Sequence, residues 1–355
     1  MGRFAPTPRV QRFKQRMGSI VYAAGVANPL NVPASDYTLS FDLISLQTII
    51  TGGTSPVVAG YGAFGPLGNV TVRVNGNRRP FSLSGWQADQ YTRVRENPYA
   101  SQLTSNPVTI SSTVPWVNHL HVPLTISEDT ERGCWYSGDT EAQMTLAITG
   151  GAATQTFSTV NAATIQGSWD VWREAFSAPA PDQPGGWLDA ISWYHELVQQ
   201  GTVNLSNGTV PFDLPRDLDY MRIWLFFYTG ADTDGTFAPA DGLYSSVDFV
   251  LNDKIHIWDN VTEAEIRFEQ LLTNGIVLSP GVAVLDMVRL KTDTGLSRRD
   301  VLPTDSANIT HAQLKITSTS ASNKCDVVTE TVSDNPFAAR WIRQAAANAG
   351  KPATA

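Results

Sequence analysis

Val117-Asn-His-Leu-His-Val-Pro-Leu-Thr-Ile126 is an apolar stretch of strand length, and a polar loop with Gly133 separates it from a second one, Ala142-Gln-Met-Thr-Leu-Ala-Ile-Thr149. The second half of the chain repeats this arrangement with Gly281-Val-Ala-Val-Leu-Asp-Met-Val-Arg-Leu290, a polar loop with Gly295, and Ala312-Gln-Leu-Lys-Ile-Thr317. Helical patterns over residues 84–99 and 262–273 precede the two copies. This repeated order predicts two similar domains in tandem, and it favours a building block over an enzyme.

Composition sets the outer limits of this interpretation. The chain has 355 residues, of which 42% are hydrophobic and only 16% charged, so two domains can each bury a core behind an unusually neutral surface. Two cysteines cannot build a disulfide framework or a cysteine-based zinc site. We see neither an apolar run long enough for a membrane span nor a signal-peptide core, and we expect a soluble protein made in the cytoplasm.

Strand signals dominate between the termini. The stretches 37–46, 69–76 and 221–228 alternate or run apolar over strand length and end at Gly, Asn or Asp turns, whereas helical patterns are short and cover residues 85–99, 189–200 and 262–273. These features predict an all-β fold of two tandem eight-stranded jelly-roll β-sandwiches with a few short helices in the connections. The Pro- and Gly-rich stretch 177–186 marks the join. The predicted segments are a basic N-terminal arm (1–35), a first jelly roll (36–166), a linker (167–188), a second jelly roll (189–333) and a C-terminal tail (334–355).

Both ends of the chain are basic, although the formal net charge is -8. Five basic residues and no acid precede Asp36, and no acid follows Asp334. In the N-terminal arm, apolar residues at helical spacing lie beside basic ones, which predicts a short amphipathic helix able to lie on anionic lipid. The residues of this predicted membrane-facing arm are Arg9, Val10, Arg12, Phe13, Lys14, Arg16 and Met17. We expect the Ala-rich C-terminal tail to be only solvated.

The sequence contains motifs that match cofactor- or metal-binding patterns only in part. The Gly-rich run over residues 60–65 matches a dinucleotide fingerprint, but Pro66 stands where a helix should begin. His119 and His121 share one face of a strand, which is metal-ligand geometry only if a third ligand converges. Asp232 and Asp234 begin a calcium-loop pattern that lacks the closing glutamate. We therefore predict no catalytic residues, no metal site and no cofactor.

The run from Val122 to Gly133, followed by Glu141-Ala-Gln-Met-Thr-Leu-Ala-Ile148, resembles the strand, Gly-bearing loop and strand of the first domain in double jelly-roll major capsid proteins. These are the coat proteins of tailless icosahedral viruses with an internal membrane, such as the tectivirus-like phages, and they are related to the adenovirus hexon. The resemblance also includes residues 69–86 and the strands and helix described above for the second half of the chain, where it lies in the order of these elements.

This resemblance implies a homotrimer of pseudo-hexagonal outline that tiles an icosahedral shell over a lipid vesicle. The partners it implies are the chain itself, neighbouring trimers, penton or minor coat proteins, and membrane lipids under the N-terminal arm. It implies no specific nucleic acid recognition, and it locates the protein in the virion after synthesis in the host cytoplasm.

Other classes of protein stay open on the sequence alone. Ten tryptophans suit a carbohydrate-binding or glycan-cleaving β-sandwich if they cluster on the surface beside paired carboxylates, whereas core packing explains them otherwise. The shell and projecting domains of a small RNA virus coat protein would also give two β-domains, although its arm would carry more than five charges. A phage spike or fibre head is a third alternative.

Overall fold

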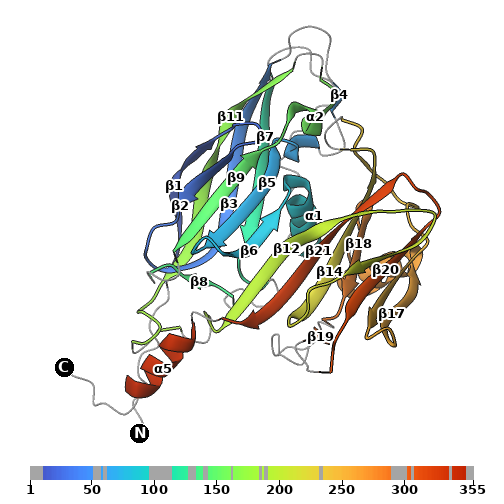
Figure 1. The fold of residues 1–355 in the computed structure, drawn as a ribbon. Helices are drawn as coiled ribbons and strands as arrows, with labels where there is room; N and C mark the ends of the chain where they lie inside the picture. Colours follow the sequence, from blue (N-terminus) through green and yellow to red (C-terminus); the bar gives the residue numbers. More distant parts are fainter. Residues whose placement is uncertain are drawn as a thin grey trace.

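The computed structural model describes residues 11–50, 57–58, 62–95, 114–126, 133–138, 143–160, 163–183, 186–187, 191–231, 235–288, 302–304, 308–335 and 338–348. Strands dominate these residues and form two sandwiches that lie side by side (Figure 1). Short helices lie in the connections, and none of the described helices is long and apolar enough to cross a membrane. The predicted residues Arg9, Val10, Asp232, Asp234 and Gly295 fall outside the described ranges.

The first sandwich places two sheets face to face. One sheet has the strand order β1-β11-β3-β7, and the facing strands follow the order β2-β9-β5-β6. The strands, in chain order, are β1 (Gln11–Val21), β2 (Ala27–Asn31), β3 (Tyr37–Ile50), β5 (Leu67–Val74), β6 (Arg78–Leu83), β7 (Val114–Pro123), β9 (Met144–Gly150) and β11 (Thr164–Ser177).

The second sandwich has one sheet of order β12-β21-β14-β18 and another of order β13-β20-β16-β17. Its strands are β12 (Trp193–Asn204), β13 (Gly208–Asp213), β14 (Asp219–Thr229), β16 (Ser246–Leu251), β17 (Ile255–Thr262), β18 (Val282–Asp286), β20 (Ala312–Ser318) and β21 (Asn323–Asp334).

The two sandwiches repeat one topology strand for strand. The eight strands of each sandwich can be numbered in chain order. Each antiparallel pair of neighbouring strands in the first sandwich then has a counterpart with the same two numbers in the second. Even the short extra strands agree, since β8 (Trp135–Tyr136) pairs with β3 and β19 (Leu302–Pro303) pairs with β14. The predicted all-β fold of two eight-stranded jelly rolls is confirmed over the described residues.

The helices follow the same repeat. Helix α1 (Gly85–Arg95) follows β6, and helix α4 (Glu263–Asn274) follows β17 at the equivalent position. The start of α4 is set by a capping box in which the Thr262 hydroxyl accepts from the Glu265 amide and the Glu265 carboxylate accepts from the Thr262 amide. Gly275 ends it in the left-handed conformation at φ 68°.

Two helix predictions are wrong. The stretch 189–200 contributes to strand β12, which pairs with β21 from Trp193 onward. The N-terminal arm is a strand as well, because β1 pairs with β11 from Gln11 to Val21. Arg12, Lys14 and Arg16 recur every second residue, so the same sequence also fits a strand, and pairing with a strand more than 140 residues away decides between the two.

The segment boundaries stay a prediction, but strands occupy parts of the chain that were predicted to be arm or linker. Strand β11 takes up residues 167–177 of the predicted linker, and β1 and β2 lie within the predicted arm. Residues 178–183, in the Pro- and Gly-rich stretch, belong to neither helix nor strand.

One hydrophobic core runs through both sandwiches. It contains the tryptophans Trp86, Trp135, Trp169 and Trp224, each at most 6% exposed. Where the structure describes the side chain, no tryptophan is among the exposed large apolar residues. This placement is the one expected from core packing, and the described side chains form no exposed tryptophan cluster of the kind on which a carbohydrate-binding interpretation depends.

Candidate functional site

The junction between the two jelly rolls is the first region that gathers polar and charged groups. Strand β6 of the first jelly roll pairs with β12 of the second in parallel, with Phe81 opposite Leu197 and Ser82 opposite Val198. This pairing joins sheets from both halves into one ten-stranded sheet. Backbone hydrogen bonds therefore fix one jelly roll against the other.

Helix α1 of the first jelly roll packs against the second. The Trp86 ring meets Phe226 edge-on at a centroid distance of 5.2 Å, and the Tyr91 ring lies 5.1 Å from that of Trp224. These aromatic contacts come from residues far apart in sequence, and they bury large apolar surfaces at the junction.

A polar cavity of about 370 Å³ lies beside this helix. Its lining groups are bonded to one another across the junction. Asp326 on β21 accepts hydrogen bonds from Gln87 Nε2 at 2.8 Å, Thr202 Oγ1 at 2.6 Å and Tyr228 Oη at 3.2 Å. Gln87 belongs to α1 and the other three residues to the second jelly roll, so the bond from Gln87 to Asp326 ties the two halves together.

A buried charge network completes the junction. Glu330 and Arg222 are both 0% exposed, and Arg222 Nη1 lies 3.0 Å from Glu330 Oε1. Glu330 also accepts from Trp224 Nε1 at 3.0 Å and from Tyr91 Oη at 3.3 Å. The other side of Arg222 faces Asp286, with Nε 3.1 Å from Oδ2. Tyr91 comes from α1, so a group of the first jelly roll is bonded to the charged centre of the second.

Opposing effects set the pKa of the Glu330 carboxyl. Burial raises it by disfavouring the charged form, but the nearby Arg222 cation and the contact with His195 outweigh burial and hold the pKa well below its usual range. Arg222 has the reciprocal shift, because burial lowers its pKa while Glu330 and Asp286 raise it. The pair is therefore ionised inside the protein, and each charge depends on the other.

The outer face of the sheet β1-β11-β3-β7 is the second such region. Asp42 alternates along β3 with Phe41 and Leu43, which are buried in the core, so its side chain lies on the opposite face. His119 Nε2 and His121 Nδ1 approach the same carboxylate oxygen of Asp42, at 3.1 and 2.8 Å. Lys14 Nζ lies 2.8 Å from its other oxygen.

The sequence alone did not show whether a third group converges on His119 and His121. They do share one face of β7, and the third group that converges on them is Asp42, which the sequence pattern had not indicated. Lys14 brings a positive charge into the same cluster and balances the carboxylate. The cluster is thus a surface ion pair with two imidazoles bonded to it.

Several of the predicted membrane-facing residues contact the rest of the protein. Lys14 pairs with Asp42, and Arg16 Nη2 lies 2.9 Å from Asp170 Oδ1. Phe13 lies under the Arg173 guanidinium at 5.9 Å, and Met17 packs against the main core. Arg12 lies on β1 as well. Lys14, Arg16, Phe13 and Met17 are therefore engaged with the body of the protein.

The C-terminal tail contains an element that the sequence analysis missed. Helix α5 (Ala338–Asn348) begins at Ala338, which packs with Tyr37 and Phe176 at the end of the first jelly roll where β1 begins, and the helix projects away from there (Figure 1). Trp341 meets the Tyr136 ring edge-on at 5.8 Å, while Ile342 is 48% exposed and Arg343 is exposed. The Arg-Trp-Ile-Arg run in an Ala-rich stretch was the available signal.

Comparison with solved structures places this architecture among viral capsid proteins. The crystal structure of the STIV MCP, from Sulfolobus turreted icosahedral virus, matches with a TM-score of 0.70 over 93% of this chain and 98% of that chain, at 13% identity. The major capsid protein P2 from bacteriophage PM2 matches with a TM-score of 0.57 over 92% and 99%, at 14% identity. The PBCV-1 virus capsid matches with a TM-score of 0.61 over 93% and 95%, at 10% identity.

The chain has the fold of these capsid proteins. The match covers nearly the full length of both partners, so the capsid-protein fold accounts for both jelly rolls together with their junction. No protein-family profile matches the sequence, and no curated protein matches it. The low identities mean that the shared feature is the arrangement of strands.

Proposed function

We propose that the protein is a structural major capsid protein whose homotrimers, pseudo-hexagonal in outline, tile an icosahedral shell over an internal lipid membrane. The observation that carries this proposal is the strand-for-strand repeat of one jelly roll within a single chain. A threefold ring of such chains places six sandwiches of the same topology around one axis, so one gene product fills hexagonal lattice positions. A non-enzymatic role fits a fold whose solved examples are capsid proteins.

The junction supports the same proposal. A shell subunit must hold its two jelly rolls at a constant angle, since a hinge between them would deform the hexagonal outline. Here the parallel pairing of β6 with β12, the packing of α1 and the buried Arg222–Glu330 pair all cross or border the junction. Neighbouring trimers and penton or minor coat proteins would then meet the outer walls of the ring.

We propose that lipid contact occurs at the end of the molecule where β1 begins. Since Lys14 and Arg16 are paired with acids and Arg12 also lies on β1, the basic residue proposed to face lipid is Arg9, with Val10 beside it. Helix α5 supports this placement because it projects at the same end and carries Arg343 and the exposed Ile342. A basic helix with exposed apolar side chains is suited to an anionic membrane surface.

The test of assembly is the mass and shape of the purified protein. We expect light scattering to give three times the 38.6 kDa chain mass at micromolar concentration. Negative-stain images should show a hexagonal outline with two towers for each chain. Obligate interfaces commonly bury more than about 2,000 Å², so dilution to nanomolar concentration should leave the trimer intact. A stable monomer, or a particle without threefold symmetry, would contradict the proposal.

A further inference from the structure

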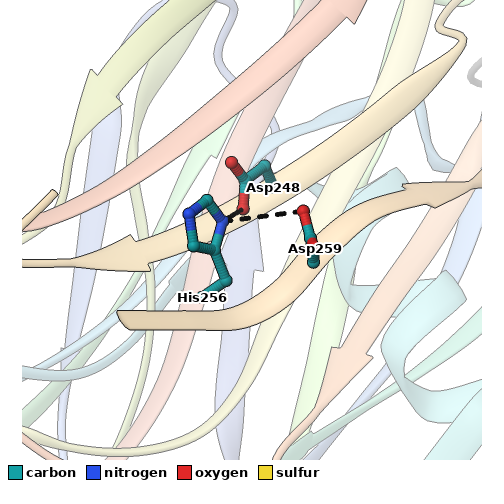
Figure 2. Close-up of side chains that lie close together, drawn as sticks. All are labelled: Asp248, His256 and Asp259. Carbon is teal, nitrogen blue, oxygen red and sulfur yellow. Dashed lines mark hydrogen bonds and ion pairs between the residues drawn. The ribbon is translucent and has the colours of Figure 1, made fainter. Parts of the chain in front are cut away.

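Three metal-ligating side chains meet on the hairpin formed by β16 and β17, away from the junction and from the outer face of the sheet β1-β11-β3-β7. Figure 2 shows Asp248 on β16 and His256 and Asp259 on β17 pointing toward one another. His256 Nδ1 lies 2.9 Å from Asp248 Oδ1 and 3.6 Å from Asp259 Oδ1. One ligand atom from each residue lies within 4.8 Å of the other two.

Irregular strand pairing brings these residues together. In a regular strand, His256 and Asp259 are three residues apart and would point to opposite faces. The register shifts between Phe249 and Val250, whose partners are Trp258 and His256, so one extra residue lies between the latter two. This bulge puts His256 and Asp259 on one face. A second shift, opposite Asp248, contains Asn260 in the left-handed conformation at φ 48°.

The electrostatics of this cluster are unbalanced. The single Nδ1 of His256 faces two carboxylates, but one N–H group donates well to only one of them, and the shorter contact is to Asp248. Asp248 is 8% exposed, so its negative charge has lost most of its water. Lys315 lies opposite Asp248 in the register of β20 and supplies one positive charge against two carboxylates. A cation between the three ligand atoms would remove the remaining repulsion.

We propose that Asp248, His256 and Asp259 bind a divalent transition-metal ion of the zinc class. Ligands about 2.1 Å from a tetrahedral ion lie about 3.4 Å from one another, close to the 2.9 and 3.6 Å separations found here. One imidazole nitrogen with two carboxylate oxygens suits Zn²⁺ or Co²⁺, whereas Ca²⁺ and Mg²⁺ prefer oxygen ligands alone.

Binding requires only a change of tautomer in the neutral imidazole. The proton on Nδ1 that bonds to Asp248 moves to Nε2, and the Nδ1 lone pair becomes the ligand. The fourth coordination position faces solvent, because the side chains of Asp259 and His256 are 70% and 41% exposed. Water would fill that position when the ion is bound.

The experiment titrates Co²⁺ and Zn²⁺ into the full-length protein, purified without a histidine tag. We expect one equivalent of Co²⁺ per chain with a visible absorption band, and displacement of Co²⁺ by Zn²⁺ with loss of that band. Asp259→Asn and His256→Ala should each weaken binding at least about tenfold, since even changes outside the ligand shell cost that much. Asp259 is exposed, so its substitution is not expected to affect folding, and a thermal melt checks this.

His311→Ala is the matched control. His311 uses its two ring nitrogens on two different carboxylates, Nε2 on Asp213 at 3.0 Å and Nδ1 on Asp253 at 3.4 Å, so it cannot chelate one ion with both acids. This variant should bind Co²⁺ as the wild type does. The proposal is overturned if the wild type shows no saturable binding, if His256→Ala binds unchanged, or if His311→Ala loses as much affinity as His256→Ala.

Discussion

At the scale of single residues, Asp42 organises the outer face of the first jelly roll. Its side chain is 8% exposed and contacts Lys14, His119 and His121, which come from two other strands. Burial raises the pKa of the Asp42 carboxyl, but the hydrogen bonds from the two imidazoles and Lys14 outweigh burial and hold the pKa well below the ordinary value of 3.8. The ionised carboxylate therefore stabilises the folded state.

We predict that Asp42→Asn lowers the free energy of unfolding at pH 7 by about 1–3 kcal/mol, because the lysine and the imidazoles lose a charged acceptor. The folded pKa of Asp42 lies below its unfolded value near 3.8, so its contribution is fully present above that pH. It is lost as the pH falls through the range below 3.8. Urea unfolding of both proteins at pH 7 and pH 3 measures this difference, which should shrink at pH 3.

Asp170→Asn is the control at this scale. Asp170 accepts from Arg16 on the same face, but its side chain is 41% exposed and water screens the pair. Its effect at pH 7 should be clearly smaller. Equal losses in the two variants would show that burial of Asp42 adds nothing.

At the scale of elements, β1 sets the limit of the N-terminal segment that can be removed. A deletion through residue 17 would take away the half of β1 that pairs with residues 172–177 of β11. A deletion of residues 1–10 removes Arg3 and Arg9 and leaves β1 in place. The second deletion therefore tests lipid contact without damaging the sandwich.

We predict that the deletion of residues 1–10 weakens binding of trimers to anionic vesicles in a flotation assay. Each basic residue near such a surface contributes on the order of 1 kcal/mol, and a trimer loses two from each of three chains. Arg343→Ala on α5 should weaken binding by a smaller amount, and added salt should weaken it in every protein. Neutral vesicles are the control. If the truncated and full-length trimers float equally well, residues 1–10 have no lipid role.

At the scale of the whole molecule, the two jelly rolls behave as one body because their contacts cross the junction. Glu330 on β21 bonds to Tyr91 on α1, and Arg222 on β14 lies between Glu330 and Asp286. Removing one partner of a buried ion pair leaves the other charge without compensation. The stability of the junction is therefore sensitive to a single proton or a single substitution.

We predict that Glu330→Gln lowers the free energy of unfolding by about 3–5 kcal/mol, measured by denaturant unfolding followed by tryptophan fluorescence. The double variant Glu330→Met with Arg222→Met should be less destabilised, because it removes both charges of the buried pair together. If the double variant is as unstable as the single one, packing and not charge governs the junction.

The sequence by itself determined the elements whose signals are local. The apolar run of β14 and the helical pattern over residues 262–273 predicted a strand and a helix in the right places. The duplication was visible for the same reason, since the same order of helical stretch, apolar strand, polar loop and apolar strand occurs in each half of the chain. His119 and His121 were placed correctly on one strand face because alternation is a property of the strand alone.

Only the tertiary structure decided the elements and contacts that depend on distant partners. Residues 11–21 fit helix and strand spacing alike, and β11 selected the strand. Asp42 joins His119 across 77 residues, and Arg222 joins Glu330 across 108. A periodic pattern records which face a residue occupies, but it carries no information about which distant segment covers that face. Long-range strand pairing and the burial of charge supply that information, and both exist only in the folded chain.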